Sequence, residues 1–438
     1  MNGARRSFLK SAGLGFLALG LPPAFLVRAA GAEQVARGKV LVVVFQRGGM
    51  DGLNVVVPFK DHAYYKLRPN IAIAEPGPGA ERAIDLDGFY GLHPALAPLK
   101  SIYDKGHLAI VHAAGSPDNT RSHFDAQDYM ELGTPGIKST PDGWLNRHLR
   151  ETARTEWSPT GTPVGRNPEQ GPPAGAGARV EGLPFRGVPF RGVALTAQTP
   201  RILVGSAPVL TLSSIEEFRL RNENLGRTLQ RLYGGASADP LFRSGAAGLF
   251  EAMATLRSVE SKIPAGAANY PAGRFGTALK QIARLTKANV GVEIAFAEIA
   301  GWDTHVNEGG ATGQLANRLR ELGEGLAAFY QDLGDRMDDV MLVTMSEFGR
   351  TARENGNRGT DHGHANVMFA MGGRLRGGKV YGRWPGLAPE VLYEGRDLDL
   401  TTDFRTVCGE ALSRHLAQKD LSKVFPNFPR MTPLGIVT

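Results

Sequence analysis

KVLVVVF, at residues 39–45, is a continuous apolar and β-branched run with glycine and polar residues on either side. A run of this kind is typical of a strand that is buried on both faces of a sheet. Comparable runs occur at residues 107–112, 292–299, 340–345 and 366–371. These stretches predict the strands of one central sheet.

Helical patterns separate the expected strands. They lie at residues 122–132, 214–232, 244–261, 275–288, 314–333 and 403–417. Buried strands that alternate with long helices are the pattern of an α/β fold. We therefore expect a mostly parallel central sheet with helices on both faces.

The first 32 residues have the layout of a leader for the twin-arginine export pathway. Arg5-Arg6 is followed by Phe8-Leu9-Lys10, by a short apolar stretch broken by prolines, and by the small-residue cleavage site Ala30-Gly31-Ala32. The apolar stretch is too short to span a bilayer, so no stable membrane span is expected after cleavage. We predict a periplasmic or otherwise exported domain at 33–438, with the twin-arginine translocase as a partner during export. A retained N-terminal anchor is the alternative.

Composition excludes some classes of protein. Loss of the leader's four basic residues lowers the formal charge from +7 to +3, and the remaining charges are interspersed, so no nucleic-acid partner is expected. The single cysteine, Cys408, excludes an intramolecular disulfide and a cluster held by four thiolates. These features fit a large domain that folds, and acquires its metal or cofactor, before export.

Residues 158–192 depart from the α/β pattern. They are dense in glycine and proline and contain PFRGV twice in near tandem, at 184–188 and 189–193. We interpret 158–192 as a partly disordered surface insertion. A peptide or glycan contact made by the paired Phe-Arg units is the alternative.

Polar residues that can bind metal follow the ends of four expected strands, where ligands gather in open α/β sheets. Carboxylate and imidazole groups mixed at short spacing are typical ligands of a divalent metal such as zinc, with manganese, iron or calcium as alternatives. Two ions could clamp the attacking and leaving oxygens of a displacement. Helix capping and backbone hydrogen bonding are the simpler roles for such residues. The expected ligands are Asp51, Asp303, His305, Glu347, Asp361, His362 and His364.

The candidate nucleophile is Ser122, with Thr120 as the alternative. Ser122 lies where a turn enters a helix, and a helix N-terminus stabilises an oxyanion and binds phosphate or sulfate. Plain N-capping is the simpler role of such a serine. Arg121 or Arg350 could pair with an anionic substrate oxygen, although a surface position is the default for arginine. His123 could be a ligand or could support one, and its case is weaker than those of the other histidines.

Seven motifs in this order resemble a bacterial family, the domain of unknown function numbered fifteen hundred and one, of the alkaline phosphatase and sulfatase superfamily. The resemblance covers residues 39–415, without the insertion. The motifs are RGGMDGLN, SHFDAQDYME, GWDTH, SEFGRT, GTDHGHAN, GGKVYGRWPGL and TTDFRTV.

The resemblance implies an alkaline phosphatase-like fold with metal ligands on loops at the carboxyl edge of the sheet. Asp51 matches the superfamily's acidic ligand after the first strand, and Ser122 matches its nucleophile. Asp303 and His305 resemble an acidic-plus-histidine ligand pair, and His362 or His364 matches a later histidine. Ser346-Glu347 stands where many members carry an Asp-His pair.

The sequence thus predicts an exported metal-dependent hydrolase of a phosphate or sulfate ester, acting on a small-molecule or polymer substrate. Cys408 does not lie in the Cys-x-Pro-x-Arg setting of superfamily sulfatases, which favours phosphate chemistry. One alternative is a non-catalytic or single-metal member of the fold that binds a cell-surface polymer or partner protein. An oxidoreductase is a weaker alternative, because no Gly-x-Gly-x-x-Gly motif joins a strand to a helix.

Overall fold

The computed structural model describes residues 37–152, 191–215, 268–429 and 431–438. The chain divides into a unit of Met1–Gly38 and a unit of Lys39–Thr438, and every feature below belongs to the second unit. The expected leader, the expected helix at 244–261, and most of both the insertion and the helix at 214–232 lie outside the described residues. Within the described ranges, no helix is long and apolar enough to cross a membrane.

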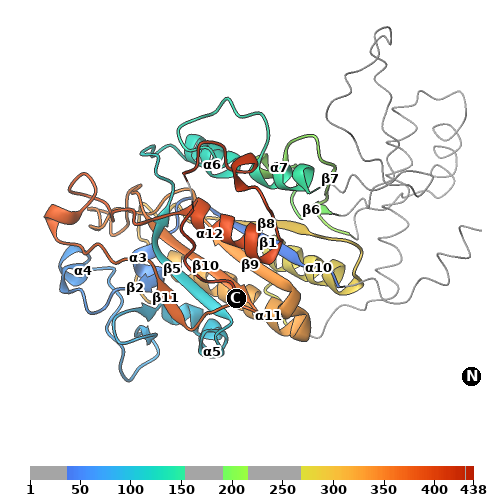
Figure 1. Ribbon diagram of the computed structural model, residues 1–438. Coiled ribbons are helices and arrows are strands. Elements are labelled where there is room, and N and C mark those ends of the chain that lie inside the picture. Colours follow the sequence, from blue (N-terminus) through green and yellow to red (C-terminus); the bar gives the residue numbers. More distant parts are fainter. Residues whose placement is uncertain (1–36, 153–190, 216–267, 430) are drawn as a thin grey trace, which may run out of the picture. The chain divides into compact units, whose positions relative to one another are not determined.

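In the part of the chain that the structure describes, the central sheet has nine strands in the order β11-β5-β10-β9-β1-β8-β6-β7, with β12 also paired to β5 (Figure 1). The apolar run at 39–45 becomes β1, which is fully buried apart from its last residue. The strands are β1 (Val40–Arg47), β5 (Leu108–Gly115), β6 (Gly192–Ala194), β7 (Val209–Thr211), β8 (Ile294–Ala300), β9 (Val340–Met345), β10 (Asn366–Gly372), β11 (Lys379–Tyr381) and β12 (Thr402–Asp403). Gly192, the last residue of the expected insertion, therefore belongs to the sheet.

Most strand pairs are parallel. Val43 of β1 faces Phe296 of β8 and Val343 of β9 in parallel register. Among these nine described strands, β10 alone runs the other way, and it pairs antiparallel with both β5 and β9. The mostly parallel α/β sheet predicted from the sequence is confirmed, and β10 is the exception within it.

Helices cover both faces of the sheet. Successive side chains of β1 point to opposite faces, and all but the last residue of β1 are buried, so each face needs a covering layer. Val42 and Val44 pack in the core that includes residues of α5 (Lys100–Asp104), α10 (Arg274–Ala288) and α11 (Gln314–Leu333). Leu41 and Val43 pack in the opposite core, with residues of α6 (His123–Leu132), α7 (Trp144–Glu151) and α12 (Phe404–Glu410). Figure 1 shows these two helical layers on either side of the strands.

The helix predictions at 275–288 and 314–333 agree with α10 and α11 to within one residue. The last predicted helix changes character at its middle, because α12 is followed by a π-helical turn at Ala411–His415. Short elements complete the described part: α3 (Gly52–Val55), α4 (His62–Leu67), and a small sheet of β2 (Val56–Val57), β3 (Ile84–Asp85) and β4 (Gly91–Leu92).

Candidate metal centre

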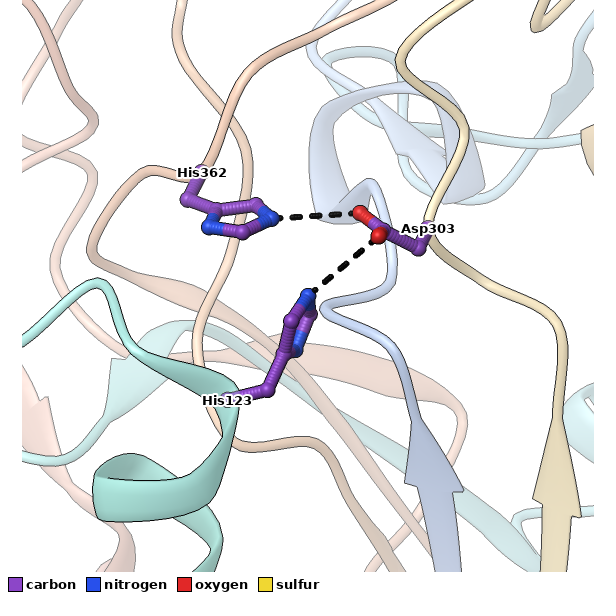
Figure 2. A group of neighbouring side chains, drawn as sticks. All are labelled: His123, Asp303 and His362. Carbon is purple, nitrogen blue, oxygen red and sulfur yellow. Dashed lines mark hydrogen bonds and ion pairs between the residues drawn. The ribbon is translucent and has the colours of Figure 1, made fainter.

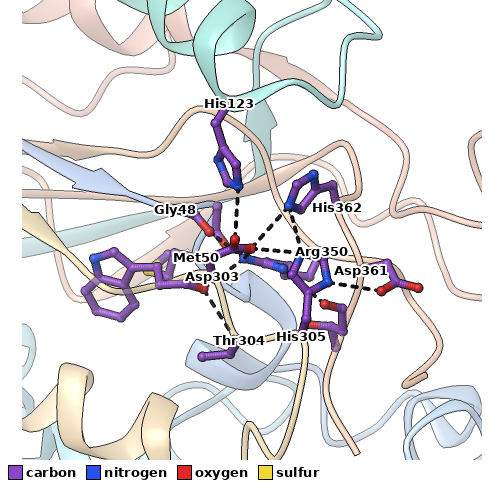
Figure 3. A network of polar contacts seen from close by, with 12 residues as sticks. Gly48, Met50, His123, Asp303, Thr304, His305, Arg350, Asp361 and His362 are labelled. Atoms are coloured by element: carbon purple, nitrogen blue, oxygen red, sulfur yellow. Dashed lines mark hydrogen bonds and ion pairs between the residues drawn. The ribbon is translucent and has the colours of Figure 1, made fainter. Parts of the chain in front are cut away.

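The candidate site lies at one edge of the sheet, where the parallel strands β1, β5, β8 and β9 have their carboxyl ends. Because β10 is antiparallel to its neighbours, its amino end meets the same edge. Residues from five segments converge there, and Figure 3 labels those of four segments: Gly48, His123, Asp303 with His305, and His362. The five segments contribute Gly48 after β1, His123 at the start of α6, Asp303 and His305 after β8, Glu347 after β9, and His362 before β10.

Glycine at position 48 permits the close approach of these segments. Gly48 has a φ of 124°, and a Cβ there would lie 2.8 Å from the backbone nitrogen of Asp303. The backbone N–H of Gly48 donates a hydrogen bond to Oε1 of Glu347 at 2.8 Å. The RGG turn after β1 therefore holds the loops after β8 and β9 side by side.

His123, Asp303 and His362 form the centre of the site (Figure 2). One potential ligand atom from each of the three lies within 4.8 Å of the others. The Nε2 atom of His362 is 3.1 Å from Oδ1 of Asp303, and the Nε2 atom of His123 is 3.5 Å from Oδ2. Two imidazoles from distant parts of the chain thus face one carboxylate.

His305 adds a third imidazole to the carboxylate of Asp303. Its Nε2 atom lies 3.0 Å from Oδ1 of Asp303 and 2.9 Å from the Nε2 atom of His362. The predicted residues Asp303, His305 and His362 are therefore brought together by the fold.

The other nitrogen of each imidazole is held by an oxygen acceptor. Nδ1 of His123 lies 2.8 Å from Oε1 of Glu347, and Nδ1 of His305 lies 3.1 Å from Oδ1 of Asp361. Nδ1 of His362 lies 2.8 Å from the backbone carbonyl of Arg121. Each Nδ1 can therefore carry the proton and donate it, which leaves the Nε2 lone pairs directed toward Asp303.

The arrangement fits a divalent metal. Three imidazole lone pairs and a carboxylate repel one another unless a cation lies among them, and nitrogen and oxygen donors of this kind suit zinc and similar ions. The Nε2 atom of His123 is buried and has no hydrogen-bond partner among the described residues, as expected for an atom reserved for a ligand. The oxygens behind each Nδ1 match the acceptors that usually orient metal-binding histidines. Residues His123, Asp303 and His362, with His305 beside them, could hold the ion.

Two acidic groups at the site, Asp303 in the centre and Glu347 behind His123, are held in the charged form. Burial would by itself raise the pKa of Asp303, but the hydrogen bond from Arg350 and that residue's charge outweigh burial and lower the pKa to about 2. Burial would also raise the pKa of Glu347, and hydrogen bonds from His123 and Gln127 bring it below its usual value. Both carboxylates therefore stay negative at neutral pH, as a cation site requires.

The two arginines predicted to bind an anionic substrate are already engaged. Arg350 is buried, and its guanidinium donates to the carbonyls of Gly48, Gly49, Trp302 and Thr360 and to Asp303. Arg121 pairs with Glu394 at 2.6 Å and with Asp397 at 2.7 Å. Arg350 therefore positions Asp303, and Arg121 supports the site through its backbone carbonyl.

Two predicted ligands lie away from the centre. Asp51 is fully buried and accepts hydrogen bonds on both carboxylate oxygens from Arg68. The ring of His364 stacks on Tyr393, with centroids 4.2 Å apart. Among the described residues one metal-competent group is found, whereas the expected ligands were numerous enough for two ions.

Ser122 is the N-cap of α6, and its side chain accepts a hydrogen bond from the backbone of Asp125 at 3.5 Å. The hydroxyl of Thr120 accepts one from the backbone of Ser122 at 3.2 Å. The capping role considered for Ser122 is thus observed. Its catalytic role stays a prediction, and the chain places it directly before His123.

His123 is the residue that sequence reasoning undervalued. It directly follows Ser122, the N-cap residue whose hydroxyl is the candidate nucleophile. His123 nevertheless lies beyond a strand end, as the other candidate ligands do. Glu347 and Asp361 were expected as ligands, and their observed contacts are with the Nδ1 atoms of His123 and His305.

Comparison with known proteins gives one family match. The sequence model of a family described as a protein of unknown function (DUF1501) matches residues 38–423. A search of curated proteins found no match. Among solved structures, the PsFucS1 sulfatase from Pseudoalteromonas sp. is similar at 12% identity and a TM-score of 0.32, over 81% of this chain and 66% of the sulfatase chain. The chain thus spans just under two thirds of that protein's length.

Proposed function

The chain belongs to the DUF1501 family of proteins of unknown function, and we propose that this member is an exported metal-dependent hydrolase of phosphate or sulfate esters. One observation carries the proposal: three Nε2 atoms are directed at the Asp303 carboxylate while each Nδ1 faces an oxygen acceptor. Kinship with the alkaline phosphatase and sulfatase superfamily and export by the twin-arginine pathway are parts of the proposal that rest on the sequence motifs.

Zinc is the proposed ion, with manganese, iron or calcium as alternatives, because three imidazoles and one carboxylate suit a metal of borderline softness. When bound, such an ion would supply Lewis-acid stabilisation of negative charge on the ester's oxygens. The chain's own contribution is orientation. Glu347, Asp361 and the Arg121 carbonyl fix the imidazole rings, and Arg350 fixes Asp303.

Ser122 is the proposed nucleophile, because it directly precedes the ligand His123 and caps the N-terminus of α6. Its Oγ forms a bond to phosphorus or sulfur as the bond from that atom to the ester oxygen breaks. The hydroxyl proton leaves to solvent, and the departing alcohol takes a proton from solvent. One water then attacks the serine ester, which releases phosphate or sulfate and restores Ser122. The dipole and free backbone amides of α6 would stabilise the negative charge on the transferred group.

The test is metal content by elemental mass spectrometry on periplasmic protein purified without chelator or nickel. We expect one equivalent of metal in the wild type and in His364→Ala, and loss of metal in His362→Ala and Asp303→Ala. His364 is the matched control because it lies two residues from His362 and outside the centre. A wild-type protein without metal, after controls for loss in handling, contradicts the proposal.

The nucleophile is tested separately, with aryl phosphate and aryl sulfate esters. Ser122→Ala should retain the metal and lose hydrolysis by a factor of at least 10³, while Thr120→Val should retain most activity. The expected loss follows from removal of the nucleophile itself.

One observation favours a second candidate, a non-catalytic metal protein that binds a polymer or partner. Both arginines expected to clamp the substrate anion are occupied by other groups of the chain. Under this alternative the wild type holds its full metal complement and hydrolyses none of the esters. Ester hydrolysis that is lost in Ser122→Ala would contradict this non-catalytic alternative.

A further inference from the structure

Asn355 uses the full hydrogen-bonding capacity of its side chain beside the metal centre. Its Nδ2 group donates to the backbone carbonyl of His305 at 2.9 Å and to Oδ1 of Asp361 at 3.1 Å. Its Oδ1 atom accepts from the backbone N–H groups of Asn357 at 2.9 Å and Gly359 at 3.2 Å. A side-chain amide has two N–H donors and one oxygen with two lone pairs, so these four bonds satisfy it completely. One side chain therefore joins the loop after β8 to the loop that leads into β10.

The orientation of the Asn355 amide is set by its neighbours. The backbone carbonyl of His305 and the ionised carboxylate of Asp361 can only accept, so the nitrogen must face them. Backbone N–H groups can only donate, so the oxygen must face the other two partners. A carboxylate at position 355 would keep the contacts with the N–H groups and would turn the other pair into repulsion between oxygens.

Asp361 needs this support because its side chain is 57% exposed. Its Oδ1 atom lies 3.1 Å from Nδ1 of His305, a contact shown in Figure 3, and it is the same atom that Asn355 holds. An exposed carboxylate loses conformational entropy when it is held in one geometry, and water competes for it. The amide of Asn355 therefore keeps the acceptor in place behind His305.

The backbones of the two loops are joined independently of the Asn355 side chain. A Cβ at Gly359 would lie 2.3 Å from the backbone oxygen of His305, so the loops are in close contact. Three backbone hydrogen bonds also join them: Asn307 to Asn357, Glu308 to Arg358, and Thr360 to Thr304. A change at position 355 should therefore act on the side chains of His305 and Asp361 before it alters the path of either loop.

We propose that Asn355 is a positioning residue of the metal centre, which acts through Asp361 to make His305 a ligand of the ion. Held in this way, His305 presents its Nε2 atom to Asp303 at 3.0 Å. An acceptor behind a metal-binding imidazole fixes the ring and raises the basicity of the nitrogen that faces the ion. This role rests on the metal binding in the proposed function and does not require ester hydrolysis.

The experiment is competition for zinc against a chromophoric chelator, on periplasmic protein first stripped of metal. Asn355→Asp preserves the size of the side chain and its acceptor, but places an oxygen against the Asp361 carboxylate. It should weaken zinc binding about 10- to 100-fold, the usual effect of disturbing such an acceptor.

Asn357→Asp is the matched control, because Asn357 is exposed in the same loop and makes its loop contacts through backbone atoms. It adds the same negative charge at a nearby position, so a general effect of charge on the cation would appear in both variants. The control should bind zinc within twofold of the wild type.

Asn355→Ala separates positioning from support of the loop. If Asn355 only supported its own loop, alanine would be the more damaging change, because it removes the acceptor for Asn357 and Gly359 that aspartate keeps. The positioning role predicts the reverse order, with weaker zinc binding in Asn355→Asp than in Asn355→Ala.

A double-mutant cycle tests whether Asn355 acts through His305. His305→Ala alone should weaken zinc binding at least tenfold, and Asn355→Asp added to it should change the affinity by less than threefold. Full additivity of the two changes, or weaker zinc binding in Asn355→Ala than in Asn355→Asp, overturns the proposal. A wild type that binds no metal overturns the proposed function as well, whereas wild-type zinc affinity in Asn355→Asp overturns the role of Asn355 alone.

Discussion

Replacement of Glu347 by glutamine should weaken metal binding while it leaves the fold intact. Oε1 of Glu347 accepts hydrogen bonds from His123, Gln127 and Gly48, each at 2.8 Å, and Oε2 lies 3.2 Å from the hydroxyl of Ser346. Glutamine can keep its oxygen at the first position and donate its amide to Ser346. The substitution therefore removes the negative charge behind His123 and preserves the shape of the side chain.

The size of the effect follows from the role of Glu347. It contacts Nδ1 of His123 and would raise the basicity of the Nε2 atom that faces the ion. Removal of such a partner typically weakens metal binding about 10- to 100-fold, or roughly 1.4–2.8 kcal/mol. The free energy of unfolding without metal should change by about 1 kcal/mol, the usual net value of a hydrogen bond.

The assay is competition for zinc against a chromophoric chelator at pH 7.5, with urea unfolding of the metal-free protein alongside. Glu298→Gln is the matched control, because Glu298 makes its ion pair with Arg47 and its side chain is 39% exposed. The control should bind zinc as the wild type does. Zinc affinity within twofold of wild type in Glu347→Gln would refute the idea that Glu347 acts on the ion through His123.

Three further predictions concern stability. Arg68→Met should lower the free energy of unfolding in urea by about 3–5 kcal/mol, because it leaves the Asp51 carboxylate buried without its partner; Lys60→Met, at an exposed pair, should cost under about 1 kcal/mol. Burial raises the pKa of Glu308 well above its usual value, so the contribution of this carboxyl group to stability falls as pH rises above about 4.3. Glu308→Gln should therefore gain stability relative to the wild type from pH 5 to pH 8, and a constant difference contradicts this. Burial lowers the pKa of His93, His112 and His415 to about 4, so the unfolded state binds more protons than the folded state below about pH 6.5. The contribution of these three residues to the free energy of unfolding should therefore fall as pH drops from about 6.5 to 4, which chemical denaturation at each pH would measure.

Much of the sheet could be predicted because burial on both faces leaves a plain pattern. β1 and β9 are continuous apolar runs, and the predicted bounds agree with the structure to within two residues. The direction of β10 relative to its neighbours could not be predicted, because a continuous apolar run fits a buried strand whether it is parallel or antiparallel to them. That direction places His362 before its strand at the same edge as the carboxyl ends of β5 and β9.

The site was predicted in part because residue type and position after a strand are visible in the sequence, whereas pairing partners are not. Asp51 follows β1 as a ligand should, but Arg68, which lies 17 residues later, takes both of its oxygens. His364 is two residues from His362, and in a strand the two side chains would point to the same face. The segment is not a strand, and the ring of His364 instead stacks on Tyr393. His123 could have been ranked higher, since it also lies beyond a strand end.

The hydrogen bonds at the three Nδ1 atoms also bear on when the protein would acquire the proposed ion. Their acceptors belong to the folded chain, so the imidazoles are oriented before any metal arrives. Asp303 and His305 are 46% and 38% exposed, so an ion can enter and leave through solvent without unfolding of the sheet. Metal occupancy should then follow the free metal concentration around the folded protein, and the compartment where the chain folds need not determine which ion it carries.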